Sequence, residues 1–564
     1  MVDDGLLRRE NGSWSASDDL STVSVPPTIQ ALVGARLDRL PTDERAVIER
    51  ASVEGKLFHR EAVSELSPVD ARPELGSRLM ALVRKELIRP GKATFTGQDA
   101  FRFRHQLFRD SAYESLPKEL RADLHVRFAD WLEASAGDSP LDLQEIVGYH
   151  LERAFRYREE LGVLDDRARS TAARAAELLV SAGRKADARQ DISAAVGLLT
   201  RGAALLPQDA PERVRVLAEL GEALIEAGDL AQAERVSTEA AEQARVLGDT
   251  SLGALALIPR ARLQMCTNVD ADLDEIKREL REAVRSLEEA GDDRGVARAW
   301  LRIAHNEYSF SEREHAVEQA LEHARRAGAR REEAEALNFL PGLAASPALT
   351  VEEGIERCRD LLAAAQGKLG LEAGALAMLG ILTTQSGRVD EGRRLHSRAR
   401  EIYSELGQRV RYSGSATSAA SMAVLAGDLP AAEAALRESL DILTKMGDKG
   451  LLTSIAWRLA DVLYEQGRHE GALDLTRVSE QAASAGDHDA QLGWRAVRAK
   501  LLARRDDPHG AEALAREAVD IAKSSNYQTG ITVSLLALAE VLRLLGRADE
   551  GRLCVHEAIE IFER

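Results

Sequence analysis

Few residues of this chain have the types and spacing that catalysis, phosphate binding or metal binding requires. The pair Gly91-Lys92 lacks the upstream glycine and the Ser or Thr of a phosphate-binding loop, and no G-x-x-x-x-G-K-[ST] stretch occurs anywhere. His315 and His323 lie eight residues apart in one predicted helix, without a third ligand at metal spacing. No Ser, His and Asp set has a local signature of nucleophilic catalysis. We therefore expect a protein that is not an enzyme and that holds no metal or cofactor of its own.

The three cysteines also predict no chemistry. Cys266, Cys358 and Cys554 are far apart and match no metal or redox spacing, so we expect buried small side chains in a reducing cytosol. No apolar run approaches the roughly 20 residues of a membrane helix. The residues from Met1 to Asp4 do not resemble a signal peptide. These features predict a cytoplasmic protein without membrane contact.

The composition favours helices and disfavours nucleic acid as a general partner. Of the 564 residues, 45% are hydrophobic but only 4% are aromatic, as expected of Ala- and Leu-rich helix pairs that need few large rings. The chain has 75 Lys and Arg against 93 Asp and Glu, which gives a net charge of −18. Such an acidic balance opposes general affinity for nucleic acid or membrane surfaces.

A small residue recurs about every 40 positions in the last 370 or so residues of the chain. The series is Ala195, Ala233, Ala316, Gly354, Gly392, Ala432, Ala472, Ala511 and Gly551, with one register skipped near Leu273. A second series runs in phase with it: Gly248, Gly291, Gly328, Gly370, Gly407, Gly447, Gly486 and Asn526. A fixed period of this length indicates a stacked repeat array, and such arrays present long binding surfaces.

One repeat shows how the two series work. Residues 413–426 are rich in Ala, Ser, Met and Val, and Gly427-Asp428 then ends the predicted helix. Pro430 suits the first turn of the next helix, whose apolar residues have helical spacing over 431–446. Gly447 ends that helix, because a left-handed cap favours a residue without a β-carbon. Each unit is therefore a helix pair, and its small residue allows the two helices to approach closely.

This pattern resembles the tetratricopeptide repeat. The best match is the series Leu217, Leu220-Gly221, Gly228-Asp229, Ala233 and Ala240. The usual repeat has roughly 34 residues, whereas these units are longer. We count ten units over 171–564, of which the third and fifth are irregular, and Pro341 interrupts the first helix of the fifth. The predicted fold is an all-α solenoid of about ten long tetratricopeptide-like helix pairs.

The first 170 residues are organised differently. A small hairpin is predicted over 6–16, with Asn11-Gly12 at its turn, and a polar connector follows over 17–27. Apolar periodicity predicts helices over 28–40, 43–53 and 74–86, with a short one over 60–65. Residues 87–91 and 100–104 bracket a glycine-containing turn, and the second segment alternates Phe and Arg as a half-buried strand does. Helices followed by a two-stranded wing predict a winged helix, and further helices are expected over 106–116, 122–133 and 143–160.

Three stretches of this region resemble the segment that follows the ATPase core in bacterial signal-transduction ATPases of the STAND type. They are Val25 to Leu40, Phe103 to Tyr113, and Gly148 to Glu152. Such proteins join an effector, often a class III nucleotide cyclase, to an ATPase, a winged helix and tetratricopeptide repeats. Related architectures end in a LuxR-type DNA-binding domain.

The resemblance implies a division of the chain. Residues 1–24 would be a remnant of the ATPase module and connector, 25–116 the winged helix, 117–170 a helical linker and 171–564 the repeat array. No paired-Asp cyclase segment precedes residue 25, and no DNA-binding domain follows the last repeat. We therefore expect the C-terminal part of such a protein, with ADP or ATP bound only in a complete assembly.

The resemblance also singles out His105. In related proteins a His at the end of the winged helix, within Met-His-Asp, reaches the β-phosphate of bound ADP. Here Arg104-His105-Gln106 occupies that place, so Met and Asp are replaced. A strand ends and a helix begins at His105, and helix N-termini favour phosphates. The alternative is that His105 packs the wing onto the helix over 106–116.

The winged helix also suggests a DNA-binding alternative. Residues 71–110 hold nine Lys and Arg against four acids, so the local charge is nine minus four, or +5. We favour instead a regulatory role, with these charges facing an ATPase module or solvent. The predicted function is a non-catalytic sensor whose array binds a protein, peptide or small inducer and relays that state through the winged helix. The alternatives are a winged-helix transcriptional regulator and a fragment of a nucleotide cyclase.

Overall fold

The computed structural model describes residues 7–10, 13–16, 27–95, 97–136, 143–305, 307, 309–344, 349–365, 367–505, 508–525 and 527–563. The chain divides into two compact units, Met1–Leu178 and Leu179–Arg564. Among the described residues, no helix is both long and apolar enough to cross a membrane.

The predicted hairpin at the start of the chain is present. Strands β1 (Leu7–Glu10) and β2 (Ser13–Ala16) pair antiparallel, with Leu7 opposite Ala16. The predicted turn Asn11-Gly12 and most of the predicted connector lie outside the described residues.

The rest of the first unit begins with α1 (Pro27–Asp38) and combines short helices with three strands. After α1 come α2 (Thr42–Glu54), β3 (Leu57–His59), α3 (Arg60–Leu66), η1 (Val69–Ala71), α4 (Leu75–Arg84), β4 (Ile88–Gly91) and β5 (Ala100–Phe103). The three strands form one antiparallel sheet in the order β3-β5-β4. Three further helices follow, α5 (Gln106–Glu114), α6 (Lys118–Ala136) and α7 (Gln144–Glu160), and the unit ends inside α8 (Asp166–Ala188).

The two strands predicted over 87–91 and 100–104 pair antiparallel as β4 and β5, and β3 adds a third strand that the sequence did not predict. Three residues are too short to show the period-2 alternation that identifies a strand in a sequence. Tertiary pairing holds β3 in place: Phe58 lies opposite Phe101, and its side chain is completely buried. Phe58 and Phe103 then pack with Ile48 and Leu79 in the core of this unit.

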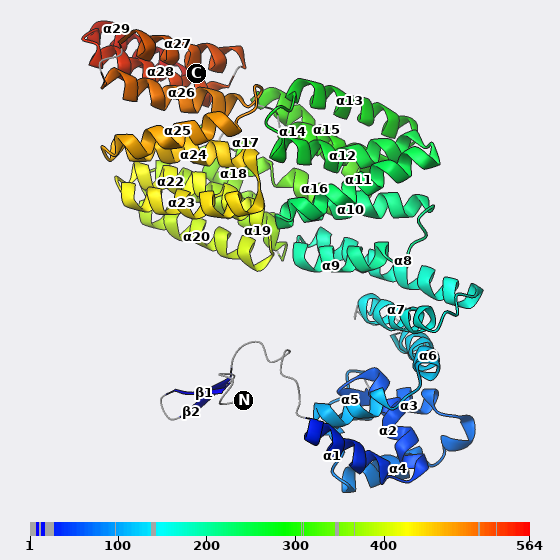
Figure 1. Ribbon diagram of the computed structural model, residues 1–564. Helices are drawn as coiled ribbons and strands as arrows, with labels where there is room; N and C mark the ends of the chain where they lie inside the picture. Colours follow the sequence, from blue (N-terminus) through cyan, green and yellow to red (C-terminus); the bar gives the residue numbers. More distant parts are fainter. Residues whose placement is uncertain are drawn as a thin grey trace. The chain divides into compact units, whose positions relative to one another are not determined.

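In the second unit the described helices form ten consecutive pairs, which confirms the predicted solenoid (Figure 1). The pairs are α8 (Asp166–Ala188) with α9 (Ile192–Ala203), α10 (Pro211–Ala227) with α11 (Leu230–Leu247), α12 (Thr250–Thr267) with α13 (Leu273–Glu289), α14 (Asp293–His305) with α15 (Phe310–Arg326), α16 (Arg330–Leu337) and α17 (Leu340–Leu343) with α18 (Val351–Ala364), α19 (Leu369–Gln385) with α20 (Val389–Glu405), α21 (Arg409–Gly414) and α22 (Ala416–Leu425) with α23 (Leu429–Met446), α24 (Lys449–Glu465) with α25 (His469–Ala482), α26 (His488–Ala503) with α27 (Pro508–Ser524), and α28 (Gln528–Leu544) with α29 (Ala548–Glu563).

The irregular pairs fall close to their predicted places. Pro341 lies at the start of α17, where the first helix of the fifth pair is broken, as predicted. The third pair is less irregular than expected, because α12 runs unbroken through Pro259. The prediction of one helix over 413–426 is wrong: the helix begins at Arg409 and is interrupted at Ser415. At Ser415 ψ is −14°, far from the roughly −42° of an α-helix.

The two periodic series mark helix ends and close approaches. Gly447 has φ 78°, in the left-handed region, and ends α23 as predicted. The small residue of each second helix lies against the first helix: Ala432 and Ala472 are fully buried. At Gly392 an added β-carbon would lie 2.5 Å from the carbonyl oxygen of Gly380. The period therefore reflects the packing distance between paired helices.

Candidate functional site

The structure places His105 on the surface at the junction of β5 and α5. Its side chain is exposed and its ring centroid lies 6.1 Å from that of Phe108. Its carbonyl oxygen accepts a hydrogen bond from the Phe108 amide at 3.1 Å. The imidazole accepts no hydrogen bond from the backbone N–H groups at the start of α5. A role for His105 in contacting ADP stays a prediction.

Most of the basic residues predicted for the winged helix have acidic neighbours. Arg78 lies 3.1 Å from Asp43, and Lys85 lies 2.6 Å from Glu44. Arg89 and Arg102 differ, because they lie opposite each other on β4 and β5 and are both exposed. The local positive charge is thus partly neutralised within the unit and is least neutralised on the wing.

Two residues from the stretches that carry the family resemblance meet in a buried chain of hydrogen bonds. The hydroxyl of Tyr113 lies 2.7 Å from Nε2 of His125 and 2.8 Å from the hydroxyl of Tyr157. Nδ1 of His125 lies 2.7 Å from Nδ1 of His150. Burial lowers the pKa of His150 to about 3, and burial together with His150 lowers the pKa of His125 well below its ordinary value. Neutral imidazoles here join α5, α6 and α7, and sequence reasoning missed His125 and Tyr157.

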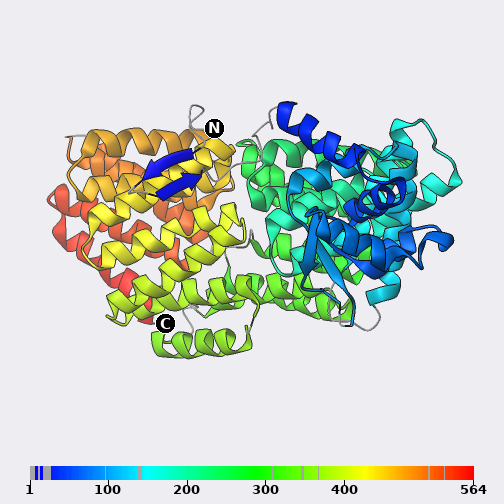
Figure 2. The same ribbon diagram turned by 90° about the horizontal axis from the view of Figure 1, so that it is seen from below.

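In the second unit, the array curves back until its two halves touch. Helix α10 contacts α21, and α12 contacts α24. The Gln408 side-chain amide donates to Oε1 of Gln190 at 3.0 Å, although 218 positions separate the two residues. The Ile192 amide donates to the Leu406 carbonyl at 3.2 Å. We call this contact line the seam, and the green half and the yellow-to-red half of the array meet along it (Figures 1 and 2).

A cavity of about 560 Å³ opens along the seam. The first half of the array lines it with the C-terminal ends of α10, α12 and α14, through residues such as Glu226, Arg262 and His305. The second half lines it with the N-terminal ends of α24, α26 and α28, through residues such as Lys449 and Thr529. We call this space the seam cavity. Its volume lies within the usual range for ligand pockets.

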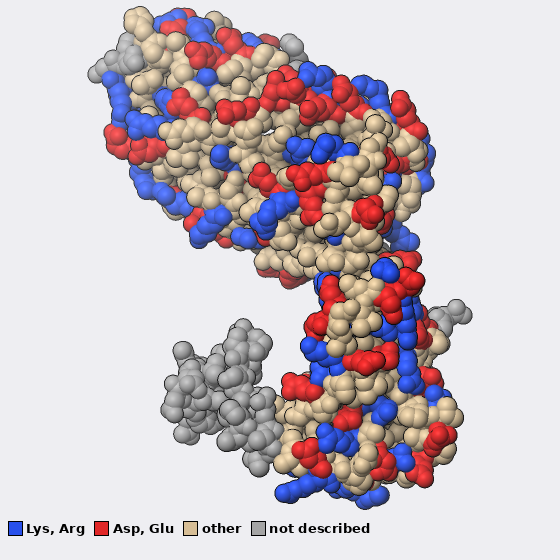
Figure 3. Space-filling view, turned by 45° about the vertical axis from the view of Figure 1, so that its right-hand side comes forward, with Lys and Arg blue, Asp and Glu red and all other residues tan. Residues whose placement is uncertain are grey.

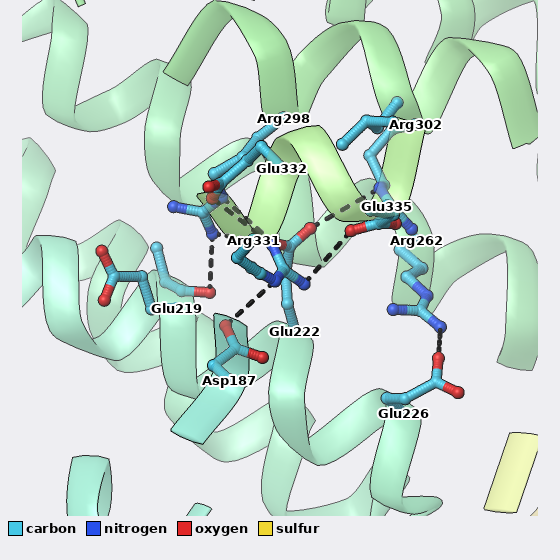
Figure 4. A network of polar contacts seen from close by, with 12 residues as sticks. Asp187, Glu219, Glu222, Glu226, Arg262, Arg298, Arg302, Arg331, Glu332 and Glu335 are labelled. Atoms are coloured by element: carbon cyan, nitrogen blue, oxygen red, sulfur yellow. Dashed lines mark hydrogen bonds and ion pairs between the residues drawn. The ribbon is translucent and has the colours of Figure 1, made fainter. Parts of the chain in front are cut away.

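A network of buried ion pairs supports the first half of the array beside this cavity (Figure 4). Glu222 lies 3.0 Å from Arg298 and 3.1 Å from Arg331, and Arg331 lies 2.9 Å from Asp187. Arg302 pairs with Glu335. The network joins α8, α10, α14 and α16, so it fixes the short helix α16 at the irregular fifth pair.

The network reaches the cavity wall through Glu226. This carboxylate lies 2.8 Å from Arg262 on α12 and 3.6 Å from Arg411 on α21, so it links both sides of the seam. Burial would raise the pKa of Glu222, but Arg298, Arg331 and Arg302 lower it to about 2. The Glu222 carboxylate therefore stays charged at neutral pH.

On the second half, the cavity wall is held by Asp489. Its oxygens accept hydrogen bonds from Arg458 at 2.8 and 3.2 Å, from Ser454 at 2.7 Å and from the Trp457 indole at 3.1 Å. Burial opposes ionisation of Asp489, but Arg458 lowers its pKa to about 2. Trp457 is buried, and its indole joins α24 to the start of α26.

Sequence reasoning missed the seam and its charged residues. One signal was present: Glu219, Glu222 and Glu226 are spaced three and four apart on α10, within residues 216–227 that are otherwise apolar, so they share one helix face. Acids on a buried face need cationic partners. No pattern in the sequence, however, indicates that α10 meets α21, because the curvature of the array sums small rotations over several pairs.

The comparisons with known proteins give no assignment for this site. No protein-family model matches the chain, and the search of curated proteins finds no match. Similar solved structures include a Rap protein complexed with competence and sporulation factor, at 14% identity and TM-score 0.44, which covers 63% of this chain and 98% of that one. A STAND protein with a tetratricopeptide repeat sensor from Pyrococcus horikoshii has 15% identity and TM-score 0.30, covering 95% of this chain and 65% of that one.

A third similar structure is the apo form of the quorum sensor NprR from B. thuringiensis. It has 14% identity and TM-score 0.34, and the match covers 62% of this chain and 99% of that one. At these values the likenesses do not indicate what this chain binds.

Proposed function

We propose that this chain is a non-catalytic sensor whose repeat array binds a peptide in the seam cavity. One observation carries the proposal: the cavity is lined by both halves of the array, at the line where they touch. A ligand there would contact both halves at once. Its binding would therefore favour one arrangement of the halves over another, which is how a ligand shifts a conformational equilibrium.

A selection experiment tests this proposal. A random peptide library is selected against the full chain, and the recovered peptides are measured against Thr529→Trp. Thr529 is exposed at the cavity, so an indole there would fill the space without removing a core contact. The matched control is Thr238→Trp, at an exposed position of α11 away from the cavity. Binding lost only in Thr529→Trp supports the proposal, and peptides that bind both variants equally would refute it.

The first unit would pass the ligand state to an ATPase module supplied by the rest of a larger assembly. The family resemblance of Val25 to Leu40 and of Phe103 to Tyr113 motivates this part of the proposal. The chain itself would neither bind nor hydrolyse ATP, because its sequence has no phosphate-binding loop. Calorimetric titration with ATP and a phosphate-release assay test this, and micromolar binding with turnover would overturn it.

The exposed pair Arg89 and Arg102 favours one alternative, a DNA-binding wing. Phosphate contacts would make such binding fall steeply with salt. We expect instead that mixed-sequence duplex stays free in a gel shift at about 150 mM salt, because the net charge of −18 opposes it. A salt-sensitive shift that is abolished by Arg89→Ala with Arg102→Ala would establish the alternative.

A further inference from the structure

The charges that line the seam cavity differ from those of the whole chain. Six cationic residues line it: Arg262, Arg302, Arg313, Arg411, Lys449 and Arg458. Four acids line it: Glu226, Asp448, Asp487 and Asp489. Six minus four leaves an excess of two positive charges, within a chain of net charge −18. Elsewhere the charges are mixed, as the face in Figure 3 shows, with Lys and Arg interspersed among Asp and Glu.

The cavity acids are already engaged by the protein. Glu226 is held by Arg262 at 2.8 Å, and Asp489 by Arg458 at 2.8 Å. Asp487 accepts hydrogen bonds from the Ala490 amide at 3.1 Å and from the Thr453 hydroxyl at 2.9 Å. Three of the four carboxylates are therefore neutralised or capped by neighbouring groups.

Two of the cations remain able to bind a ligand. Lys449 is exposed, and within the described part of the chain its ammonium makes no hydrogen bond or ion pair. Arg411 is 24% exposed, and among the residues that the structure describes its one ion pair is with a carboxylate oxygen of Glu226, at 3.6 Å. The N-terminal ends of α24, α26 and α28 add partial positive charge on the same side of the cavity.

Asp448, the fourth acid of the cavity, indicates that the ligand also supplies a hydrogen-bond donor. Oδ1 of Asp448 accepts the Leu451 amide at 3.0 Å and caps α24. Oδ2 of Asp448 is buried and has no hydrogen-bond partner among the described residues. A buried acceptor without a donor is costly, so a ligand N–H at this position would stabilise the complex. Leu451, Phe310 and Met265 supply apolar surface nearby.

From this arrangement we infer that the seam cavity selects an acidic peptide. Lys449 and Arg411 bind its carboxylate, and Asp448 accepts one of its backbone N–H groups. The carboxylate comes from an Asp or Glu side chain or from the C-terminus of the peptide. This inference rests on the proposed function and specifies its ligand class.

The test uses the peptides recovered by selection against the full chain. Their affinities are measured by fluorescence polarisation against wild type, Lys449→Gln and the control Lys445→Gln, an exposed lysine outside the cavity. Each peptide is also made with Asp and Glu replaced by Asn and Gln, and separately with an amidated C-terminus. We expect Lys449→Gln to weaken binding about three- to tenfold, as loss of one partly exposed charge pair does. Lys445→Gln should have no effect.

The outcomes separate the inference from the proposed function. Loss of affinity on Asn and Gln replacement identifies a side-chain carboxylate, and loss on amidation identifies the C-terminus; either result supports the inference when Lys449→Gln also weakens binding. A second outcome is that the selected peptides are neutral or basic, that Thr529→Trp abolishes their binding, and that Lys449→Gln does not change their affinity. This outcome overturns the inference but supports the proposed function. Peptides that Thr529→Trp does not block overturn both.

Discussion

Glu222 shows most clearly how single residues hold the array together. Its side chain is 1% exposed and faces Arg298, Arg331 and Arg302. Burying a charged group costs free energy, and only close partners of opposite charge offset that cost. Removing one partner therefore leaves the remaining charges buried without compensation. Glu222 therefore stabilises the fold because it neutralises three buried guanidinium groups.

We expect Glu222→Gln to lower the free energy of unfolding by about 3 kcal/mol, the range for a broken buried pair. Glu557→Gln is the matched control, because Glu557 pairs with Lys523 at 2.7 Å on the surface, where both side chains are nearly half exposed. That change should cost at most about 1 kcal/mol. Urea unfolding measures both variants, and equal costs would contradict the buried network.

Replacing a glycine of the array with alanine should raise or lower the free energy of unfolding according to the space around that glycine. At Gly392 a β-carbon would clash with the Gly380 carbonyl, so Gly392→Ala should destabilise by about 1–3 kcal/mol. Gly197 lies inside α9 with open space around it, so Gly197→Ala should stabilise by about 0.5–1 kcal/mol. Thermal unfolding tests the pair. The same sign for both would mean that the repeat register is wrong.

At the scale of elements, α6 and α7 depend on two neutral histidines. The folded pKa values of His125 and His150 lie below the unfolded value of about 6.5. As the pH falls below that value, these histidines bind protons in the unfolded chain but not in the folded unit. Their contribution to the free energy of unfolding is therefore present above pH 6.5 and is lost as the pH falls below it.

Between pH 7.5 and 5.5 we expect a loss of about 1 kcal/mol for each of these histidines. His150→Gln should remove about half of this pH dependence, because His125 stays buried, whereas His556→Gln, at an exposed position of α29, should leave it unchanged. Urea unfolding of the full chain provides the measurement, followed through the fluorescence of Trp131 on α6 in a background where the other four tryptophans are replaced by Phe. An unchanged slope in His150→Gln would show that folding does not lower the pKa of His150.

The elements of the array could be predicted from the sequence because their signals are local. Gly447 ends α23 and Pro341 breaks the fifth pair through backbone geometry that each residue imposes by itself. Strand β3 could not be predicted, because only its pairing with β5 holds it extended. The interruption at Ser415 likewise has no strong breaker beside it, apart from Gly414.

At the scale of the whole molecule, the candidate site could not be predicted at all. Gln190 and Gln408 meet across 218 positions, and no local pattern marks them as neighbours. The sequence singled out His105 through a family resemblance, whereas the cavity draws on helix ends from both halves of the array. Sites built by the closing of a solenoid follow from accumulated rotations between repeats, which only the three-dimensional structure reveals.

The central claim is that a ligand binds both halves of the array at the seam. Hydrogen exchange of the full chain, with and without the tightest selected peptide, tests it most directly. We expect slower exchange at the end of α12 and at the start of α24, around Met265 and Gly450, whose backbones lie close together across the seam. Slower exchange confined to the outer helices, or to one half of the array alone, would contradict it.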